Sequence, residues 1–275
     1  MFSMFRLGPR KFARSIHRSV GEDSSVDVSE SDGVRSLHLG TDTIQSSMRI
    51  KAPFDLELTY TRGMMAFLLF SSQVKNVLAI GLGGGSVPKY IHNHLPEIST
   101  RVVEINPQII NIARSHFYVP EDDENLQVIA GDGIVYLQEN QTSAQVLMID
   151  AFDSKGIPSD MCTQEFFDSC AGALTNDGMM AINLWGSDRN FDVYLQRIEQ
   201  SFNQRVLILP TGRPGNIVVF GFRCAPADLR WATLRERAKT LESNHKIEFL
   251  EFVEKLRAHN ANTNNRLLLE SDTVS

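Results

Sequence analysis

Four chemically useful groups in this sequence each end or follow a short apolar run that is typical of a β-strand. A glycine loop, Gly81-Leu82-Gly83-Gly84-Gly85-Ser86, follows residues 74–80, and three acidic residues stand at the ends of later runs: Glu104, Asp132 and Asp150. In an open parallel sheet, ligands bind where the carboxyl ends of the strands meet. The spacing therefore predicts one crevice that gathers backbone N–H groups and carboxylates.

The glycine loop predicts a nucleoside site. Backbone N–H groups at Gly81, Gly83 and Gly85 can approach a ligand closely because no Cβ intervenes, and the helix that follows adds its N-terminus. A dinucleotide fingerprint would place its third small residue at Ser86, and serine fits that position poorly. The loop therefore favours an adenosyl-sulfonium ligand of the S-adenosylmethionine type over a pyrophosphate.

Two of the acidic residues suit an adenosine. Glu104 ends the second predicted strand, where a carboxylate can accept both ribose hydroxyl protons. Asp132, followed by Gly133, comes after the third strand and can reach the adenine or the ribose edge. Either acid can instead be a turn or helix cap, so the interpretation depends on their occurrence together.

Asp150 and Asp153 predict an amine site beyond the fourth strand. Two carboxylates there can hold a cationic amine, and one can accept the proton that the amine must lose before it attacks carbon. The structural alternative is that Asp153 caps a turn and Asp150 serves only packing. We expect no metal, since His92 and His94 are two residues apart on a predicted helix and point to different sides.

Strands and helices alternate around these groups. Apolar runs at 74–80, 101–105, 126–130, 145–149 and 179–184 are separated by helical patterns, and a hairpin follows at 205–222. Alternation of this kind indicates a mainly parallel sheet covered on both faces. The predicted fold class is α/β: a Rossmann-like S-adenosylmethionine-dependent transferase fold with an antiparallel edge hairpin and a small N-terminal β-hairpin region.

The same patterns divide the chain into four segments. Residues 1–33 are expected to be a disordered tail that is basic and then acidic, and residues 34–72 a small β-hairpin region with a helix. Residues 73–224 are expected to form the Rossmann-like cofactor-binding catalytic domain, and residues 225–275 the C-terminal helices and tail.

Composition limits the partners. A net charge of −6 and a pI of about 5.7 argue against a general attraction to nucleic acid or to anionic membranes. No apolar run approaches the ~18 residues that span a bilayer. The three cysteines form no C-x-x-C pair, which is typical of a reduced, cytoplasmic protein. The basic N-terminal stretch is either a targeting peptide or a loose tail.

The sequence resembles the spermidine/spermine synthase (polyamine aminopropyltransferase) family over residues 37–222. The resemblance rests on these stretches: Ile44-Gln45, Tyr60, Val77-Leu78-Ala79-Ile80-Gly81 with its loop, Val103-Glu104-Ile105, Gly131-Asp132-Gly133 and Asp150-Ala151-Phe152-Asp153. It implies a dimer or a tetramer, and we expect a homodimer. It also implies decarboxylated S-adenosylmethionine as donor and putrescine or a related amine as acceptor.

The resemblance also implies roles for individual residues. Gln45 would lie on the donor side and hold the donor together with the glycine loop and the acids at 104 and 132. Asp150, helped by Asp153 and Tyr60, would orient and deprotonate the amine. The amine would then displace the thioether in line, with positioning and charge providing most of the catalysis.

Four positions depart from the family pattern. Gly84 stands where the family carries the aspartate that holds the donor's ammonium, Thr61-Arg62 replaces His-Glu, and Ser154 replaces proline. Ordinary S-adenosylmethionine also carries a carboxylate, which Arg62 or Lys89 would suit. Beside the aminopropyltransferase, two alternatives therefore stay open: an S-adenosylmethionine-dependent methyltransferase on the same fold, and a non-catalytic nucleoside-binding protein.

Overall fold

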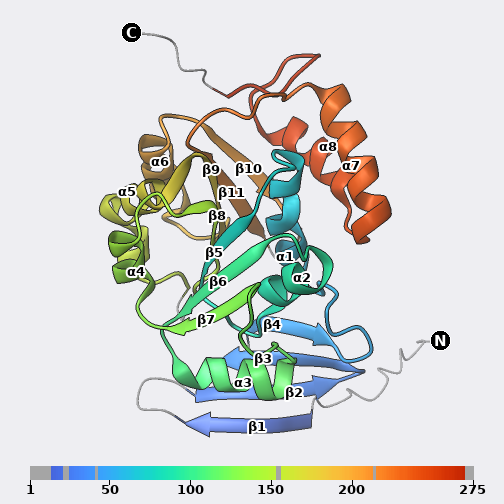
Figure 1. Cartoon of the computed structure of the whole chain (residues 1–275), viewed down its shortest axis with the longest axis vertical. Coiled ribbons are helices and arrows are strands. Elements are labelled where there is room, and N and C mark those ends of the chain that lie inside the picture. The colour runs from blue at the N-terminus through green and yellow to red at the C-terminus, as the bar shows by residue number, and fades with distance from the viewer. Residues whose placement is uncertain (1–13, 21–24, 41–42, 153–155, 213–214, 270–275) are drawn as a thin grey trace, which may run out of the picture.

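The computed structural model describes residues 14–20, 25–40, 43–152, 156–212 and 215–269. In this part of the chain a four-stranded sheet lies beneath a seven-stranded sheet that is flanked by helices (Figure 1). Fully buried side chains of the small sheet, such as Val28 and Leu37, belong to the same apolar cluster as residues of the large sheet. The two sheets therefore share a core.

The small sheet is antiparallel, with its strands in chain order: β1 (Arg14–Val20), β2 (Ser25–Ser31), β3 (Val34–Leu39) and β4 (Ile44–Arg49). The β3–β4 pairing confirms the predicted hairpin. The prediction of a disordered tail through residue 33 is wrong for β1 and β2. Val26 and Val28 alternate with polar residues and are fully buried, a period of two that the Ser/Asp/Glu-rich composition concealed.

The large sheet has the order β10-β11-β9-β8-β5-β6-β7. Its parallel strands are β5 (Asn76–Ile80), β6 (Ser99–Glu104), β7 (Leu126–Ala130), β8 (Ala144–Ile149) and β9 (Leu174–Trp185). The hairpin of β10 (Val206–Pro210) and β11 (Asn216–Phe222) adds an antiparallel edge. The predicted α/β fold class is confirmed.

Helices cover both faces of this sheet (Figure 1). One face carries α4 (Gly133–Glu139), α5 (Gln164–Ala173) and α6 (Phe191–Ser201). The other carries α1 (Thr59–Met64), a 3₁₀ helix (Met65–Leu69), α2 (Ser86–His94), α3 (Pro107–Phe117), α7 (Trp231–His245) and α8 (Phe249–His259).

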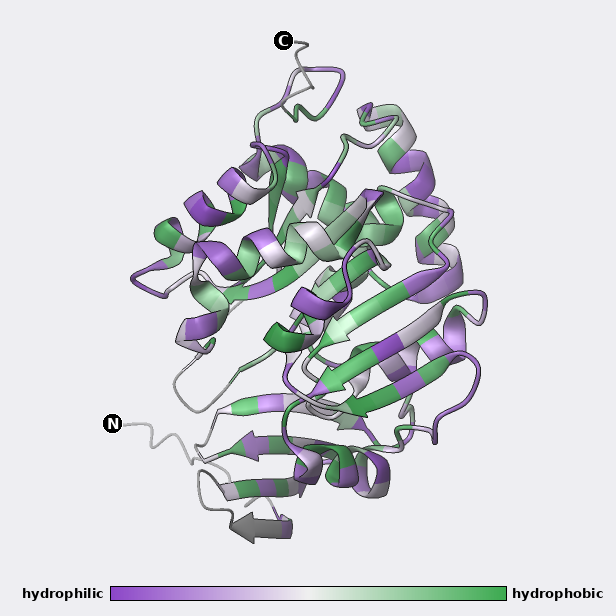
Figure 2. Ribbon diagram, turned by 60° about the vertical axis from the view of Figure 1, so that its left-hand side comes forward, coloured by the Kyte–Doolittle hydropathy of each residue, from purple (hydrophilic) through white to green (hydrophobic). Residues whose placement is uncertain are grey.

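Side chains of the central strands alternate between the two cores. In β5, Val77 and Ala79 face one apolar cluster while Leu78 and Ile80 face the other. Figure 2 shows the result, with apolar strands inside and polar helix faces outside. Among the described residues, no helix is long and apolar enough to cross a membrane.

The strand order places a crevice at the end of β5. From β5 the chain continues to β6 and β7 on one side, and then crosses to β8 and β9 on the other. An open α/β sheet binds ligands at such a reversal of strand order, outside the carboxyl ends of the strands. The ends of β5, β6 and β8 carry Gly81, Glu104 and Asp150, so the topology brings the predicted groups together.

Candidate active site

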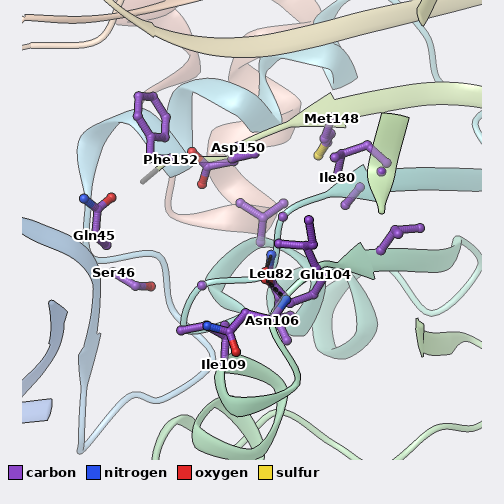
Figure 3. A pocket seen from close by; sticks show the side chains of 18 of the residues that line it. Gln45, Ser46, Ile80, Leu82, Glu104, Asn106, Ile109, Met148, Asp150 and Phe152 are labelled. Atoms are coloured by element: carbon purple, nitrogen blue, oxygen red, sulfur yellow. Dashed lines mark hydrogen bonds between the residues drawn. The ribbon is translucent and has the colours of Figure 1, made fainter. Parts of the chain in front are cut away.

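A cavity of about 540 Å³ lies at these strand ends (Figure 3). It is lined by eight of the predicted site residues: Gln45, Tyr60, Gly81, Gly83, Glu104, Asp132, Gly133 and Asp150. Gly85 is not among the lining residues and instead forms the N-cap of α2, with a φ of 64°. Asp153 lies outside the described residues.

Gly81 allows the ends of β5 and β8 to approach each other. It has a φ of 93°, and a Cβ at this position would collide with the backbone carbonyl oxygen of Asp150. The Asp150 N–H donates to the Ile80 carbonyl at 3.0 Å across the same junction. A side chain at position 81 would therefore push Asp150 away from the glycine loop.

Glu104 is fixed by backbone groups around it. One carboxylate oxygen accepts the Leu82 N–H at 2.9 Å and the other accepts the Asn106 N–H at 2.9 Å. Burial raises the pKa of Glu104, while these backbone hydrogen bonds act in the opposite direction. A carboxylate has about four lone-pair positions, so Glu104 can hold the glycine loop and still accept hydroxyl protons from a ligand.

Asp132 is the N-cap of α4. Its Oδ1 accepts the N–H groups of Ile134 at 2.8 Å and of Val135 at 3.4 Å, while the residue also lines the cavity. The cap that the sequence offered as the structural alternative is therefore present. It does not exclude a ligand contact, because these bonds involve only one of the two carboxylate oxygens.

Asp150 is held by side chains. Its Oδ1 accepts the amide N–H of Asn183 at 3.0 Å, and the Asn183 carbonyl oxygen in turn accepts the amide N–H of Asn216 at 2.9 Å. Asn183 is only 2% exposed. Burial raises the pKa of Asp150 to about 6, and hydrogen bonds from Asn183 and Tyr60 limit that rise. The carboxyl is therefore ionised at neutral pH and readily protonated just below it.

Tyr60 connects Asp150 to the small sheet. Its hydroxyl donates to the backbone carbonyl of Gln45 at 3.1 Å and also makes a side-chain hydrogen bond with Asp150. Burial, followed by the charge of Asp150, raises the pKa of Tyr60 well above its usual value, so the phenol stays neutral. Because a phenol has one proton, it cannot donate to both acceptors at once.

Ser46 fills the space beside Gly84. A Cβ at Gly84 would lie 2.7 Å from the Ser46 Oγ and 3.0 Å from a ring carbon of Phe117. The Ser46 hydroxyl also lies 3.2 Å from that of Ser86, within hydrogen-bond distance. A side chain at position 84 would therefore require the Ser46 side chain, from β4, to move.

Among the described residues that line the cavity, there are four carboxylates and no lysine, arginine or histidine. The two bases considered from the sequence are engaged elsewhere. Arg62 donates to Glu248 at 2.9 Å, and Lys89, 1% exposed, donates to the Phe117 carbonyl at 2.7 Å. Neither lines the cavity, so neither is placed to receive a ligand carboxylate there.

Sequence reasoning missed several residues of this site. Asn183 interrupts the otherwise apolar end of β9, and that interruption was the available signal. Phe152 lies inside the Asp150-to-Asp153 motif, where sequence reasoning assigned it no role, and it lines the cavity, as does Asp160 from a 3₁₀ helix (Ser159–Cys162). In the described part of the chain, no group of three or more metal-ligating side chains is present.

The fold is of the Rossmann-like transferase type, with a carboxylate-lined cavity at its strand ends. A model of the spermine/spermidine synthase domain matches residues 57–209. A curated polyamine aminopropyltransferase of Chromobacterium violaceum is 38% identical over 258 residues, which is 94% of this chain and 99% of that protein. The chain belongs to the spermine/spermidine synthase family.

Solved structures share the fold. A spermidine synthase in complex with the transition state analogue AdoDATO aligns with a TM-score of 0.68 and 18% identity, over 87% of this chain and 85% of that one. Human methyltransferase-like protein 13 in complex with SAH aligns with a TM-score of 0.63 and 23% identity, over 69% and 93% of the two chains. At these identities the likeness extends to the fold alone.

Proposed function

We propose that this protein transfers an aminopropyl group from decarboxylated S-adenosylmethionine to an amine such as putrescine. The observation that supports this most is the charge of the cavity, where the described lining residues include four carboxylates and no basic side chain. The decarboxylated donor and the amine are both cationic, whereas S-adenosylmethionine adds a carboxylate that this lining would repel. The methyltransferase and the non-catalytic alternatives are not favoured.

In this proposal the donor's adenosine lies against the glycine loop. Glu104 accepts the ribose hydroxyl protons, and Asp132 with Gly133 borders the adenine. Gly81 and Gly83 allow the backbone to approach the sulfonium side of the donor, and Gly85 shapes the start of α2. Gln45 closes this space from β4.

Asp150 is the proposed base. It binds the amine through a charge-assisted hydrogen bond and takes its proton, while Tyr60 donates to the carboxylate. The neutral nitrogen attacks the methylene carbon next to sulfur. The N–C bond forms, the C–S bond breaks, and its electron pair stays on sulfur, which leaves as a neutral thioether. Asp153 is proposed as a second carboxylate at this end.

The test is calorimetric titration with the decarboxylated donor and with S-adenosylmethionine, followed by a transfer assay with putrescine. We expect tighter binding of the decarboxylated donor and formation of spermidine. Tighter binding of S-adenosylmethionine, together with methylation of an amine, would replace this proposal with a methyltransferase. Tight nucleoside binding without turnover on any amine would support a binding protein.

We also propose a cytoplasmic location and a homodimeric state. A cytoplasmic location is supported by the three cysteines, all of which are free thiols. A homodimer stays a prediction, and sedimentation of the purified protein would test it.

A further inference from the structure

The acceptor end of the cavity carries an aromatic side chain that the proposed reaction does not use. Phe152 lines the cavity two residues after Asp150, and Figure 3 shows the two side chains together, away from Glu104 and Asn106 at the nucleoside end. The face of an aromatic ring attracts cations, so a ring near the proposed base can hold an ammonium group.

Trp185 supports this ring from behind. The rings of Phe152 and Trp185 are stacked, with centroids 5.4 Å apart and an angle of 24° between their planes. Trp185 is the last residue of β9. Its indole lies close to Gly156, since a Cβ placed on that glycine would be 3.6 Å from the ring. Because Trp185 covers one face of Phe152, the remaining surface of the ring is the part that borders the cavity.

The charge of the cavity suits a second cation. Asp160 also lines the cavity and is exposed, and the described lining contains no basic side chain that would compete for the ring face. A diamine has two ammonium groups. One must lie at Asp150 to react, so the other must lie elsewhere along the same cavity.

We propose that Phe152, backed by Trp185, forms the subsite for the distal ammonium of a linear diamine acceptor. The distal cation lies on the Phe152 ring while the reacting nitrogen lies at Asp150. This inference rests on the proposed aminopropyl transfer. It makes Phe152 a specificity-determining residue that selects diamines over monoamines of equal length.

The test compares Phe152→Leu with the wild-type enzyme on two amines. Leucine keeps an apolar wall and removes the ring, so it separates a cation–π contact from simple packing. A cation–π contact of about 0.5–2 kcal/mol corresponds to roughly a 2- to 30-fold change. We expect kcat/KM for 1,4-diaminobutane to fall by that factor, while the inhibition constant of butylamine against the diamine changes by less than about twofold.

Further variants identify the source of the effect. Trp185→Phe keeps a stacked ring and should retain most of the diamine selectivity, whereas Trp185→Leu should lose part of it. Tyr118→Leu makes the same kind of aromatic-to-leucine change at a residue that is 45% exposed and outside the cavity lining, and should change neither constant. Donor affinity, measured by calorimetry, should be equal in all of these variants.

The outcomes separate this inference from the proposed function. Equal loss for diamine and monoamine in Phe152→Leu would show that the ring only packs against the alkyl chain, and would overturn the inference while leaving aminopropyl transfer intact. No loss for either amine would overturn it as well. If the wild-type enzyme transfers nothing to any amine, the proposed function fails instead.

Discussion

Removing the amide of Asn183 should raise the pKa of Asp150 and shift the pH dependence of the reaction. Asn183 donates to Asp150 Oδ1 at 3.0 Å in a buried position, and this bond stabilises the ionised form. A hydrogen bond to a charged group contributes about 1.5–3 kcal/mol. Because one pKa unit corresponds to about 1.4 kcal/mol, Asn183→Ala should move the pKa from about 6 to about 7 at the lower limit.

The assay is kcat/KM for the acceptor across the pH range at saturating donor, because this quantity reports the free enzyme's essential base. Near pH 5.5 the ionised fraction of Asp150 would fall about eightfold in the variant, and near pH 9 the two enzymes should be equal, since the carboxyl is ionised in both. Asn140→Ala, at the end of α4 and outside the cavity lining, is the matched control and should keep the wild-type midpoint.

Two results would refute this reasoning. An unchanged midpoint would mean that Asn183 does not stabilise the ionised carboxylate. A rate lowered by the same factor at every pH would mean that Asn183 only orients Asp150. Asn216→Ala should give a smaller shift of the same sign, because Asn216 acts on Asp150 through Asn183.

Three further predictions follow from the site. Asp150→Asn should raise the free energy of unfolding near pH 8 by at most about 3 kcal/mol, because the folded pKa of about 6 lies above the unfolded value of 3.8 and burial therefore opposes ionisation. This wild-type loss develops as the pH rises from about 4 to about 6, so urea unfolding well below pH 4 should show no difference. Because Asp150 is only half-buried and water reaches it through the cavity, about 3 kcal/mol is an upper bound. Glu104→Gln places an amide NH₂ against the backbone N–H groups of Leu82 or Asn106. It should therefore weaken binding of the aminopropyl donor by about 10- to 100-fold in calorimetry. An unchanged affinity would remove Glu104 from the donor site. Gly84→Asp should lower the melting temperature through its collision with Ser46, and Ser46→Gly should recover part of that loss in the double variant, whereas strictly additive effects would contradict the contact.

The sequence carries the part of this site that depends on local pattern. Apolar runs followed by polar strand ends locate Gly81, Glu104 and Asp150, because a parallel sheet brings equivalent strand ends to one edge. The hydrogen bonds that hold Asp150 come from residues that are distant in the sequence. The Asn216–Asn183 bond requires the antiparallel register of β11 against β9, which pairs Asn216 with Trp185 and Val218 with Asn183.

The contact between Ser46 and Gly84 also joins segments that are distant in the sequence. It joins β4 of the small sheet to the glycine loop of the large one, and neither segment's pattern indicates it. The strand β2 was missed for a different reason, since its two buried valines, Val26 and Val28, are surrounded by residues that are usual in linkers. Local periodicity thus predicted the elements, and pairing between distant elements determined which residues touch.

The cavity carboxylates differ in the groups that donate hydrogen bonds to them. Both Glu104 and Asp132 accept backbone N–H groups, whose positions are fixed by the chain. Within the described residues, Asp150 instead receives hydrogen bonds from side chains, those of Asn183 and Tyr60.

Those partners can adjust when Asp150 takes a proton. The Tyr60 hydroxyl lies between Asp150 and the carbonyl of Gln45, and it has one proton to donate. When Asp150 is ionised, Tyr60 donates to it. When Asp150 is protonated, Tyr60 can donate to Gln45 and accept from Asp150. Protonation of Asp150 therefore leaves no buried donor without a partner.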